Sequence, residues 1–141
     1  MVNGTTKNIY LLRHGKVEGK AALNGFSDVL VNPELQQQIC DALVHQGIAV
    51  DAVITSPLKR CSDLAHLYAE RISVPLSVAP EFQEMNFGEV DGIAFDELKD
   101  KWAMLDTFWQ DPSNHKLSGA ESLQNFHERV TQAWSQLLND P

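Results

Sequence analysis

The chain has 141 residues, which fits a single domain with a core of its own. Hydrophobic residues make up 43% and charged residues 21%, as in ordinary globular proteins, and no apolar run approaches the roughly 20 residues of a membrane span. The net charge of −8 argues against a nucleic acid or an anionic membrane as a partner, because both favour basic surfaces.

The positive charges gather near the N-terminus. Residues 1–20 contain four basic side chains against the single acid Glu18, so this stretch carries +3 and the remainder −11. Such a segment suits a small anionic ligand, and a chance run of solvated lysines is the alternative. The two cysteines, Cys40 and Cys61, lack metal-like spacing and predict reduced thiols in a cytoplasmic protein.

The first third of the chain predicts a strand, a loop and a helix. Residues 7–13 form a continuous apolar run ended by Gly15, which indicates a short buried strand. Residues 16–33 have no periodicity and predict a long loop, and such loops in compact domains are usually functional. Pro33 then opens a helix that Gly47 ends.

The middle of the chain predicts two more strands around a second helix. Residues 50–55 indicate a strand, and Ser56-Pro57 predicts a helix start with Ser as N-cap and Pro at the first helical position. Residues 74–78 indicate a third short strand, weakened by Pro75. A loop containing Gly88 and Gly92 follows.

The last third predicts two helices. An amphipathic stretch over residues 95–109 places Trp102 and Trp109 in the core, and Trp134 has core spacing in the final helix. Ser118 and Glu121 have the spacing of a capping box that opens this final helix.

The order of the elements indicates a three-layer α/β/α sandwich with a mostly parallel central sheet. In α/β folds the chain after such a helix normally forms another strand of the sheet. The pattern therefore predicts a strand after Pro141. We therefore expect residues 1–141 to be one domain that lacks its C-terminal strand and helix. The missing strand would leave sheet edges exposed. Exposed edges favour association of two copies of the chain, so a homo-oligomer can form.

The tripeptide Arg13-His14-Gly15 ends the first predicted strand at the edge where open α/β sheets bind ligands. A neutral imidazole with one free nitrogen is a competent nucleophile toward phosphorus. The guanidinium of Arg13 offers a planar fork that matches phosphate oxygens. A hydrogen-bonded structural histidine is the alternative interpretation of His14.

Three further residues extend this hypothesis. Arg60 falls in the first turn of the second helix, where free N–H groups favour anions, although it could be an exposed helix charge. Glu84 suits a general acid if it is buried, and is otherwise a solvated loop carboxylate. Glu121 is either a capping residue or part of a site. The remaining histidines do not have the spacing of metal ligands, although the loop residue His115 could reach a site. The sequence contains no glycine-rich loop of the kind that binds nucleotide phosphates. We therefore expect no cofactor.

Several segments in this order and spacing resemble the histidine phosphatase family, the phosphoglycerate-mutase-like enzymes. The nearest resemblance is to the α-ribazole-5′-phosphate phosphatase branch of cobalamin synthesis, which has a similar Glu-Met-x-Phe-Gly segment. The matching segments are Leu11-Leu12-Arg13-His14-Gly15, Leu23-Asn24-Gly25-Phe26-Ser27-Asp28, Thr55-Ser56-Pro57-Leu58-Lys59-Arg60-Cys61, Leu64-Ala65, residues 84–92 and Gly119-Ala120-Glu121-Ser122.

The resemblance implies a phosphomonoesterase acting on a small phosphorylated metabolite without a metal. His14 would become phosphohistidine, and Arg13 and Arg60 would hold the phosphoryl oxygens. Glu84 would protonate the leaving alcohol and then activate water, beneath a covering helix that carries Trp102 and Trp109. Three residues would line or support the substrate pocket: Asn24, Gly25 and Glu121.

Two departures from the family pattern alter this expectation. The usual Asn after Arg-His-Gly is Lys20 here, whose ammonium could replace that contact. The family's second histidine would follow residue 141, so these residues are expected to be the N-terminal part of a longer protein, or a truncated product with very poor activity. The alternatives are a phosphoglycerate mutase, a sugar-bisphosphatase, or an inactive anion-binding module.

Overall fold

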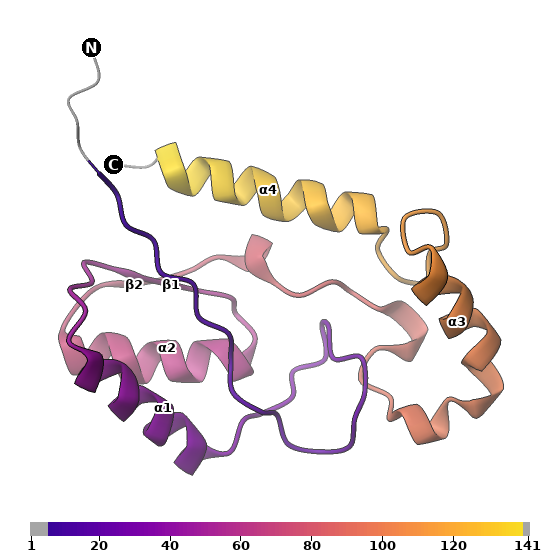
Figure 1. The fold of residues 1–141 in the computed structure, drawn as a ribbon, viewed down its shortest axis with the longest axis horizontal. Helices are drawn as coiled ribbons and strands as arrows, with labels where there is room; N and C mark the ends of the chain where they lie inside the picture. The colour runs from indigo at the N-terminus through magenta and orange to yellow at the C-terminus, as the bar shows by residue number, and fades with distance from the viewer. Residues whose placement is uncertain (1–5, 140–141) are drawn as a thin grey trace.

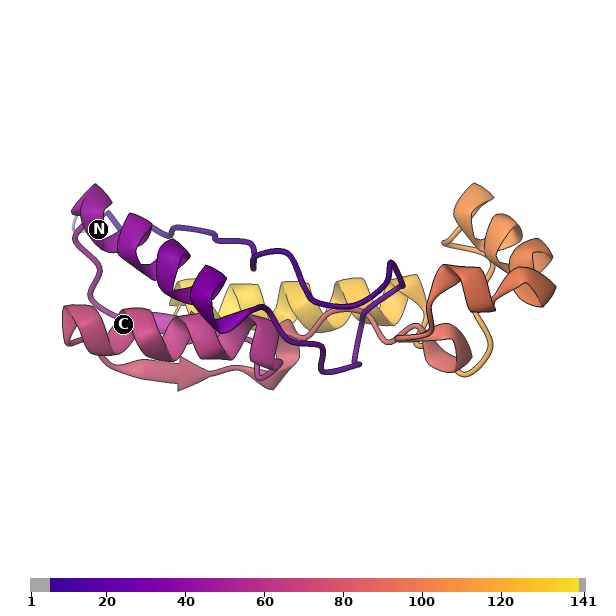
Figure 2. The same ribbon diagram turned by 90° about the horizontal axis from the view of Figure 1, so that it is seen from below.

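The computed structural model describes residues 6–139. The described chain is elongated, with α3 at one end and α4 running lengthwise on the opposite side of the sheet from α2 (Figures 1 and 2). Its helices and strands, in chain order, are α1 (Pro33–Gln46), β1 (Val53–Thr55), α2 (Lys59–Ile72), β2 (Leu76–Val78), α3 (Trp102–Gln110) and α4 (Leu123–Asn139). Four 3₁₀ turns lie between β2 and α3: η1 (Pro80–Phe82), η2 (Gly88–Val90), η3 (Phe95–Glu97) and η4 (Lys99–Lys101).

The sheet within the described residues contains two parallel strands. Val53 of β1 lies opposite Leu76 of β2, and Thr55 lies opposite Val78. Helix α2 joins the two strands and packs against both, as a crossover between parallel strands requires. The predicted α/β class with a parallel sheet is therefore confirmed, and so are two of the three predicted strands, each shorter than expected.

The predicted strand over residues 7–13 is wrong. This segment is irregular and exposes Tyr10 to 59%, Leu11 to 82% and Leu12 to 59%. An apolar run becomes a buried strand only where a neighbouring strand pairs with it and helices cover its faces. In residues 6–139, β1 pairs with β2 and no strand pairs with this segment.

Helix α1 matches its prediction because its end signals are local. The Asn32 side chain accepts a hydrogen bond from Glu34 N at 2.8 Å, and Pro33 occupies the first turn. Gly47 ends the helix in the left-handed region with φ 66°, a conformation that favours glycine.

Helix α2 begins later than Ser56-Pro57 predicts. The helix starts at Lys59, and the Ser56 hydroxyl accepts only a long bond of 3.4 Å from Leu58 N. The N-terminus is capped instead by Asp28, whose carboxylate accepts from Lys59 N at 2.7 Å. A residue 31 positions away therefore performs the capping that the local sequence assigned to Ser56.

The main core lies beneath α3, and its packing corrects the prediction for two tryptophans. Trp102 and Trp109 are 51% and 55% exposed, because the buried face of α3 is the one that carries Leu105 and Phe108. Trp134 of α4 is half-buried. The core side chains are Met85, Val90, Leu98, Leu105, Phe108, Leu117 and Ala120.

The predicted capping box is also wrong. Helix α4 starts at Leu123, and the hydroxyl of Ser122 accepts from Asn125 N at 3.1 Å. Glu121 instead accepts a hydrogen bond from Asn86 N at 2.9 Å. The carboxylate therefore links two distant segments, which requires a contact that the local sequence does not reveal.

Candidate active site

His14 is half-buried, and its hydrogen bond defines the state of its ring. The Nδ1 atom lies 2.7 Å from the carbonyl oxygen of Gly15. Because a carbonyl oxygen only accepts hydrogen bonds, Nδ1 is the donor in this contact and Nε2 takes no part in it. The contact therefore leaves Nε2 as the ring nitrogen placed to act as a nucleophile.

The glycine after His14 packs closely against α1. A Cβ at Gly15 would lie 2.7 Å from Cδ1 of Ile39, the end of a flexible side chain that would have to shift to admit a larger residue. The contact holds the backbone beside His14 although no strand forms there. Arg13 is exposed, and no hydrogen bond in residues 6–139 joins it or His14 to the other predicted site residues.

Arg60 is buried in the first turn of α2, with 2% exposure, and is not an exposed helix charge. Its Nη1 donates to Ser27 O at 2.8 Å, and its Nη2 donates to Asn24 O at 3.1 Å and to Gly25 O at 2.8 Å. These bonds use three of the five guanidinium N–H groups. The structure thus brings together three predicted site residues, with Arg60 anchoring the loop that contains Asn24 and Gly25.

Gly25 fits closely against the next loop. A Cβ at this position would overlap the carbonyl oxygen of Met85 and crowd the Asp91 carboxylate. The loop over residues 24–28 therefore approaches residues 84–91 as closely as backbone permits, which only glycine allows at this point.

Asp91 is a residue that sequence reasoning missed. Its carboxylate accepts from the N–H groups of Phe26 and Ser27, at 3.0 and 2.9 Å, from Gly25 N at 3.3 Å and from the Ser27 hydroxyl. It also accepts from Phe87 N at 3.0 Å. Partial burial raises the pKa of Asp91, but the bonds from Ser27, Phe87 and Phe26 outweigh it and hold the pKa below its usual value.

Glu84 is exposed, so the burial expected of a general acid is not found and the side chain is a solvated loop carboxylate. Its Oε1 accepts from Met85 N at 2.7 Å. The charges of Arg60 and Glu84 both affect the pKa of the Cys61 thiol. Burial raises the pKa of the Cys61 thiol, Arg60 and the hydrogen bond with Ser56 lower it, and Glu84 raises it further.

Arg129 is the second residue that sequence reasoning missed. Its Nη2 donates to Glu121 Oε1 at 2.7 Å, and its Nη1 donates to the carbonyl oxygens of Glu81 and Gln83 at 2.7 and 3.0 Å. The side chains of Arg129 and Glu121 are only 23% and 19% exposed. The only signal in the sequence is the spacing of two helical turns between them, which by itself assigns no role.

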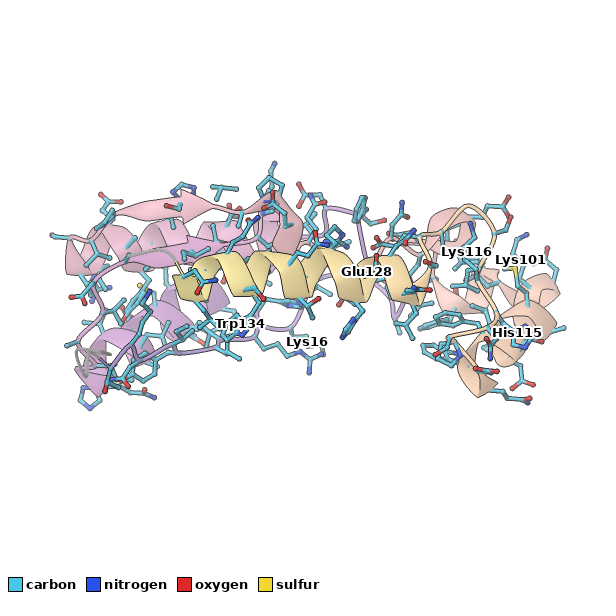
Figure 3. The ribbon with its side chains drawn as sticks, turned by 90° about the horizontal axis from the view of Figure 1, so that it is seen from above. Lys16, Lys101, His115, Lys116, Glu128 and Trp134 are labelled. Atoms are coloured by element: carbon cyan, nitrogen blue, oxygen red, sulfur yellow. The ribbon has the colours of Figure 1, made fainter. Side chains whose placement is uncertain are left out.

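Two other candidates lie elsewhere. Lys20 pairs with Asp96 at 3.3 Å on the surface, so its ammonium is engaged there and not at His14. His115 lies with Lys101 and Lys116 at the end of the molecule that carries α3, well apart from Lys16, which follows Gly15 (Figure 3).

Two hollows on the described surface measure about 480 and 430 Å³. The first lies between α1 and α2 and the second against α3, and none of the seven predicted site residues lines either. Between residues 6 and 139, no group of three or more His, Cys, Asp or Glu side chains is arranged to hold a metal ion. No helix in the same range is long and apolar enough to cross a bilayer.

The chain is similar to known phosphatases. It is 30% identical over 99 residues to the broad-specificity phosphatase YOR283W of Saccharomyces cerevisiae, covering 64% of this chain and 43% of the relative. It is 26% identical over 127 residues to the adenosylcobalamin/alpha-ribazole phosphatase of Escherichia coli, covering 86% of this chain and 62% of the relative. The chain thus spans about two fifths to three fifths of the length of these curated relatives.

The fold has solved counterparts, and residues 9–141 match one family. The crystal structure of the alpha-ribazole phosphatase from Shigella flexneri matches with a TM-score of 0.77 at 22% identity, covering 91% of this chain and 65% of that one. This likeness confirms the predicted phosphoglycerate-mutase-like α/β fold. Residues 9–141 match the histidine phosphatase superfamily, branch 1, over nearly the whole sequence. The chain therefore belongs to the histidine phosphatase superfamily.

Proposed function

We propose that this chain carries a phosphomonoesterase site that works through phosphohistidine at His14. The observation that carries the proposal is the bond from Nδ1 of His14 to Gly15 O, which leaves Nε2 as the ring nitrogen outside that contact. Membership of the histidine phosphatase superfamily supports the same reaction class.

In the first half of the reaction, Nε2 of His14 attacks the phosphorus and forms a P–N bond. The bond from phosphorus to the alcohol oxygen breaks, and that oxygen takes a proton from the Glu84 carboxyl. In the second half, Glu84 removes a proton from water as the water oxygen attacks phosphorus and the P–N bond breaks. Inorganic phosphate leaves, and both side chains return to their starting states.

The two arginines stabilise charge in this scheme. Arg13 is exposed and free to turn toward a phosphate, and its bidentate fork matches two phosphoryl oxygens. Arg60 uses three N–H groups on the 24–27 loop, so it contributes through its two other N–H groups and through its buried positive charge. The proposed scheme needs no metal ion, because positive charge near the phosphoryl group comes from these side chains.

For the substrate, we propose α-ribazole 5′-phosphate, a phosphomonoester from the synthesis of the cobalamin nucleotide loop. Support comes from the resemblance of residues 84–88 to that branch and from the names of the Escherichia coli and Shigella flexneri relatives. The pocket would be lined in part by Asn24 and Gly25, with Glu121 in support.

The test measures phosphate release from α-ribazole 5′-phosphate and isomerisation of 3-phosphoglycerate by the 141-residue chain, each with a His14→Ala variant. Slow release of phosphate that requires His14 is the expected result, because the second histidine expected of the family is not among these residues. Isomerisation in place of release would identify a mutase, and preferential hydrolysis of a sugar bisphosphate would overturn the substrate assignment. Binding of inorganic phosphate without turnover would contradict catalysis by this chain.

A further inference from the structure

The hydrogen bonds of Arg129 converge on the backbone around Glu84. From α4, its Nη1 donates to the carbonyl oxygens of Glu81 and Gln83, and its Nη2 lies 3.5 Å from that of Glu84. The guanidinium thus contacts three carbonyl oxygens in a stretch of four residues. The stretch ends at Glu84, which transfers the protons in the proposed reaction.

Glu121 completes the arrangement on the other side of Glu84. It accepts from Arg129 Nη2 at 2.7 Å and Nε at 3.4 Å, and from Asn86 N at 2.9 Å, while its own N–H donates to Asn86 O at 3.1 Å. The ion pair therefore holds the chain both before and after Glu84. The Glu84 side chain itself accepts from Met85 N at 2.7 Å.

The chemistry of these contacts requires arginine. A single planar guanidinium bonds a carboxylate and several carbonyl oxygens at once, whereas a lysine ammonium is a point charge on a flexible stem. The pair is mostly shielded from solvent, so these charge-assisted bonds are stronger than those of an exposed pair. Arg129 also lies over the rings of Phe126 and Phe26, at 5.2 and 6.0 Å, which connects it to the 24–27 loop.

We propose that Arg129, paired with Glu121, is a positioning residue that sets the Glu84 carboxyl for proton transfer to the leaving oxygen. The inference rests on the proposed function. Arg129 contacts the backbone of residues 81–84 and acts through Glu84. Glu121 accordingly supports the general acid, a more specific role than lining the substrate pocket.

The leaving group separates this role from a merely structural one. An alkyl alkoxide is a poor leaving group and needs a proton in the transition state, whereas p-nitrophenolate leaves readily without one. A misplaced general acid therefore slows hydrolysis of an alkyl phosphate far more than hydrolysis of p-nitrophenyl phosphate. A general loss of structure slows both reactions alike.

The experiment compares both substrates with the 141-residue chain and its Arg129→Gln and Arg129→Lys variants. For each variant we expect kcat on the alkyl phosphate to fall about 10²-fold with little change in KM, and kcat on p-nitrophenyl phosphate to fall only a few-fold. Glu84→Gln should show the same selectivity, and adding Arg129→Gln to it should cost nothing further on the alkyl phosphate. Arg71→Gln, which breaks an exposed pair with Asp41, is the matched control and should change neither rate.

An equal loss on both substrates, or no loss on either, overturns the proposal. A second readout does not depend on turnover: the amide of Met85, which donates to Glu84 Oε1, should shift in the NMR spectrum of Arg129→Lys and lose protection from hydrogen exchange. An unchanged Met85 amide refutes the positioning role. If the parent chain hydrolyses neither substrate, the proposed function fails, and the Met85 readout still decides whether Arg129 holds this segment. The lysine variant keeps the charge and serves if the glutamine variant does not fold.

Discussion

Arg60 and Asp91 hold the same short loop through opposite backbone groups. Arg60 donates to the carbonyl oxygens of residues 24, 25 and 27, while Asp91 accepts from the N–H groups of residues 25, 26 and 27. The two charged side chains thus replace the secondary structure that this loop lacks, since buried backbone groups need partners. The loop with Asn24 and Gly25 is consequently fixed relative to α2 and to residues 84–91.

Replacing Arg60 should destabilise the protein. Arg60→Met leaves three carbonyl oxygens without their donor in a buried place, which costs about 2–4 kcal/mol of unfolding free energy. Urea unfolding measures the loss, with Lys59→Met as a matched control on the exposed neighbouring side chain. A change below about 0.5 kcal/mol would mean that Arg60 does not anchor the loop.

Asp91→Asn should cost about 1–3 kcal/mol near neutral pH, because an amide group replaces an acceptor that faces several donors. The pKa of Asp91 is lowered in the folded protein below its usual 3.8. Its contribution to stability is therefore fully present above that value and is lost as the pH falls through the lower, folded pKa. Urea unfolding from pH 7 downward should show a constant difference between the two proteins that shrinks below about pH 4. A difference that grows toward acid pH would contradict the assignment.

Gln36 of α1 predicts a stabilising substitution. It is 3% exposed, and neither polar atom of its side chain has a partner among the described residues. Gln36→Met keeps the length of the side chain and removes the buried, unsatisfied amide, so the unfolding free energy should rise by about 1–3 kcal/mol. A rise in Tm is the measurement, and a fall in Tm would show that this amide has a partner in solution.

The Cys61 thiol reports on the position of Glu84. Burial raises the pKa of Cys61 above its usual 9.0, and the Glu84 charge raises it further. Glu84→Gln should therefore shift the pH dependence of alkylation by iodoacetamide to lower pH. Glu89→Gln removes an exposed carboxylate from the same loop and should leave that dependence unchanged. The same response to both variants would place Glu84 away from Cys61.

The sequence predicted those elements whose signals are local. Pro33 and Gly47 lie directly at the ends of α1 and predicted it. The start of α2 could not be predicted, because Asp28 caps it from 31 residues away. The strand over residues 7–13 failed because apolar composition alone does not provide a pairing partner.

The same distinction applies to the site. Arg60 was predicted in the first turn of a helix, which fixed its place, but its bonds to the 24–27 loop depend on the tertiary fold. Asp91 and Arg129 looked like ordinary charged residues in a loop and on a helix. Their roles arise from contacts across 45 to 66 residues, which no local pattern encodes.

The most direct test of this account labels the protein with ³²P from a phosphomonoester, quenches the reaction, and examines the label. We predict a label on the 141-residue chain that is labile in acid and stable in base, that maps to His14, and that disappears in His14→Ala. His127→Ala, an exposed histidine on α4, should retain the label in full. Undiminished labelling of the His14→Ala protein would contradict the assignment of His14 as the nucleophile.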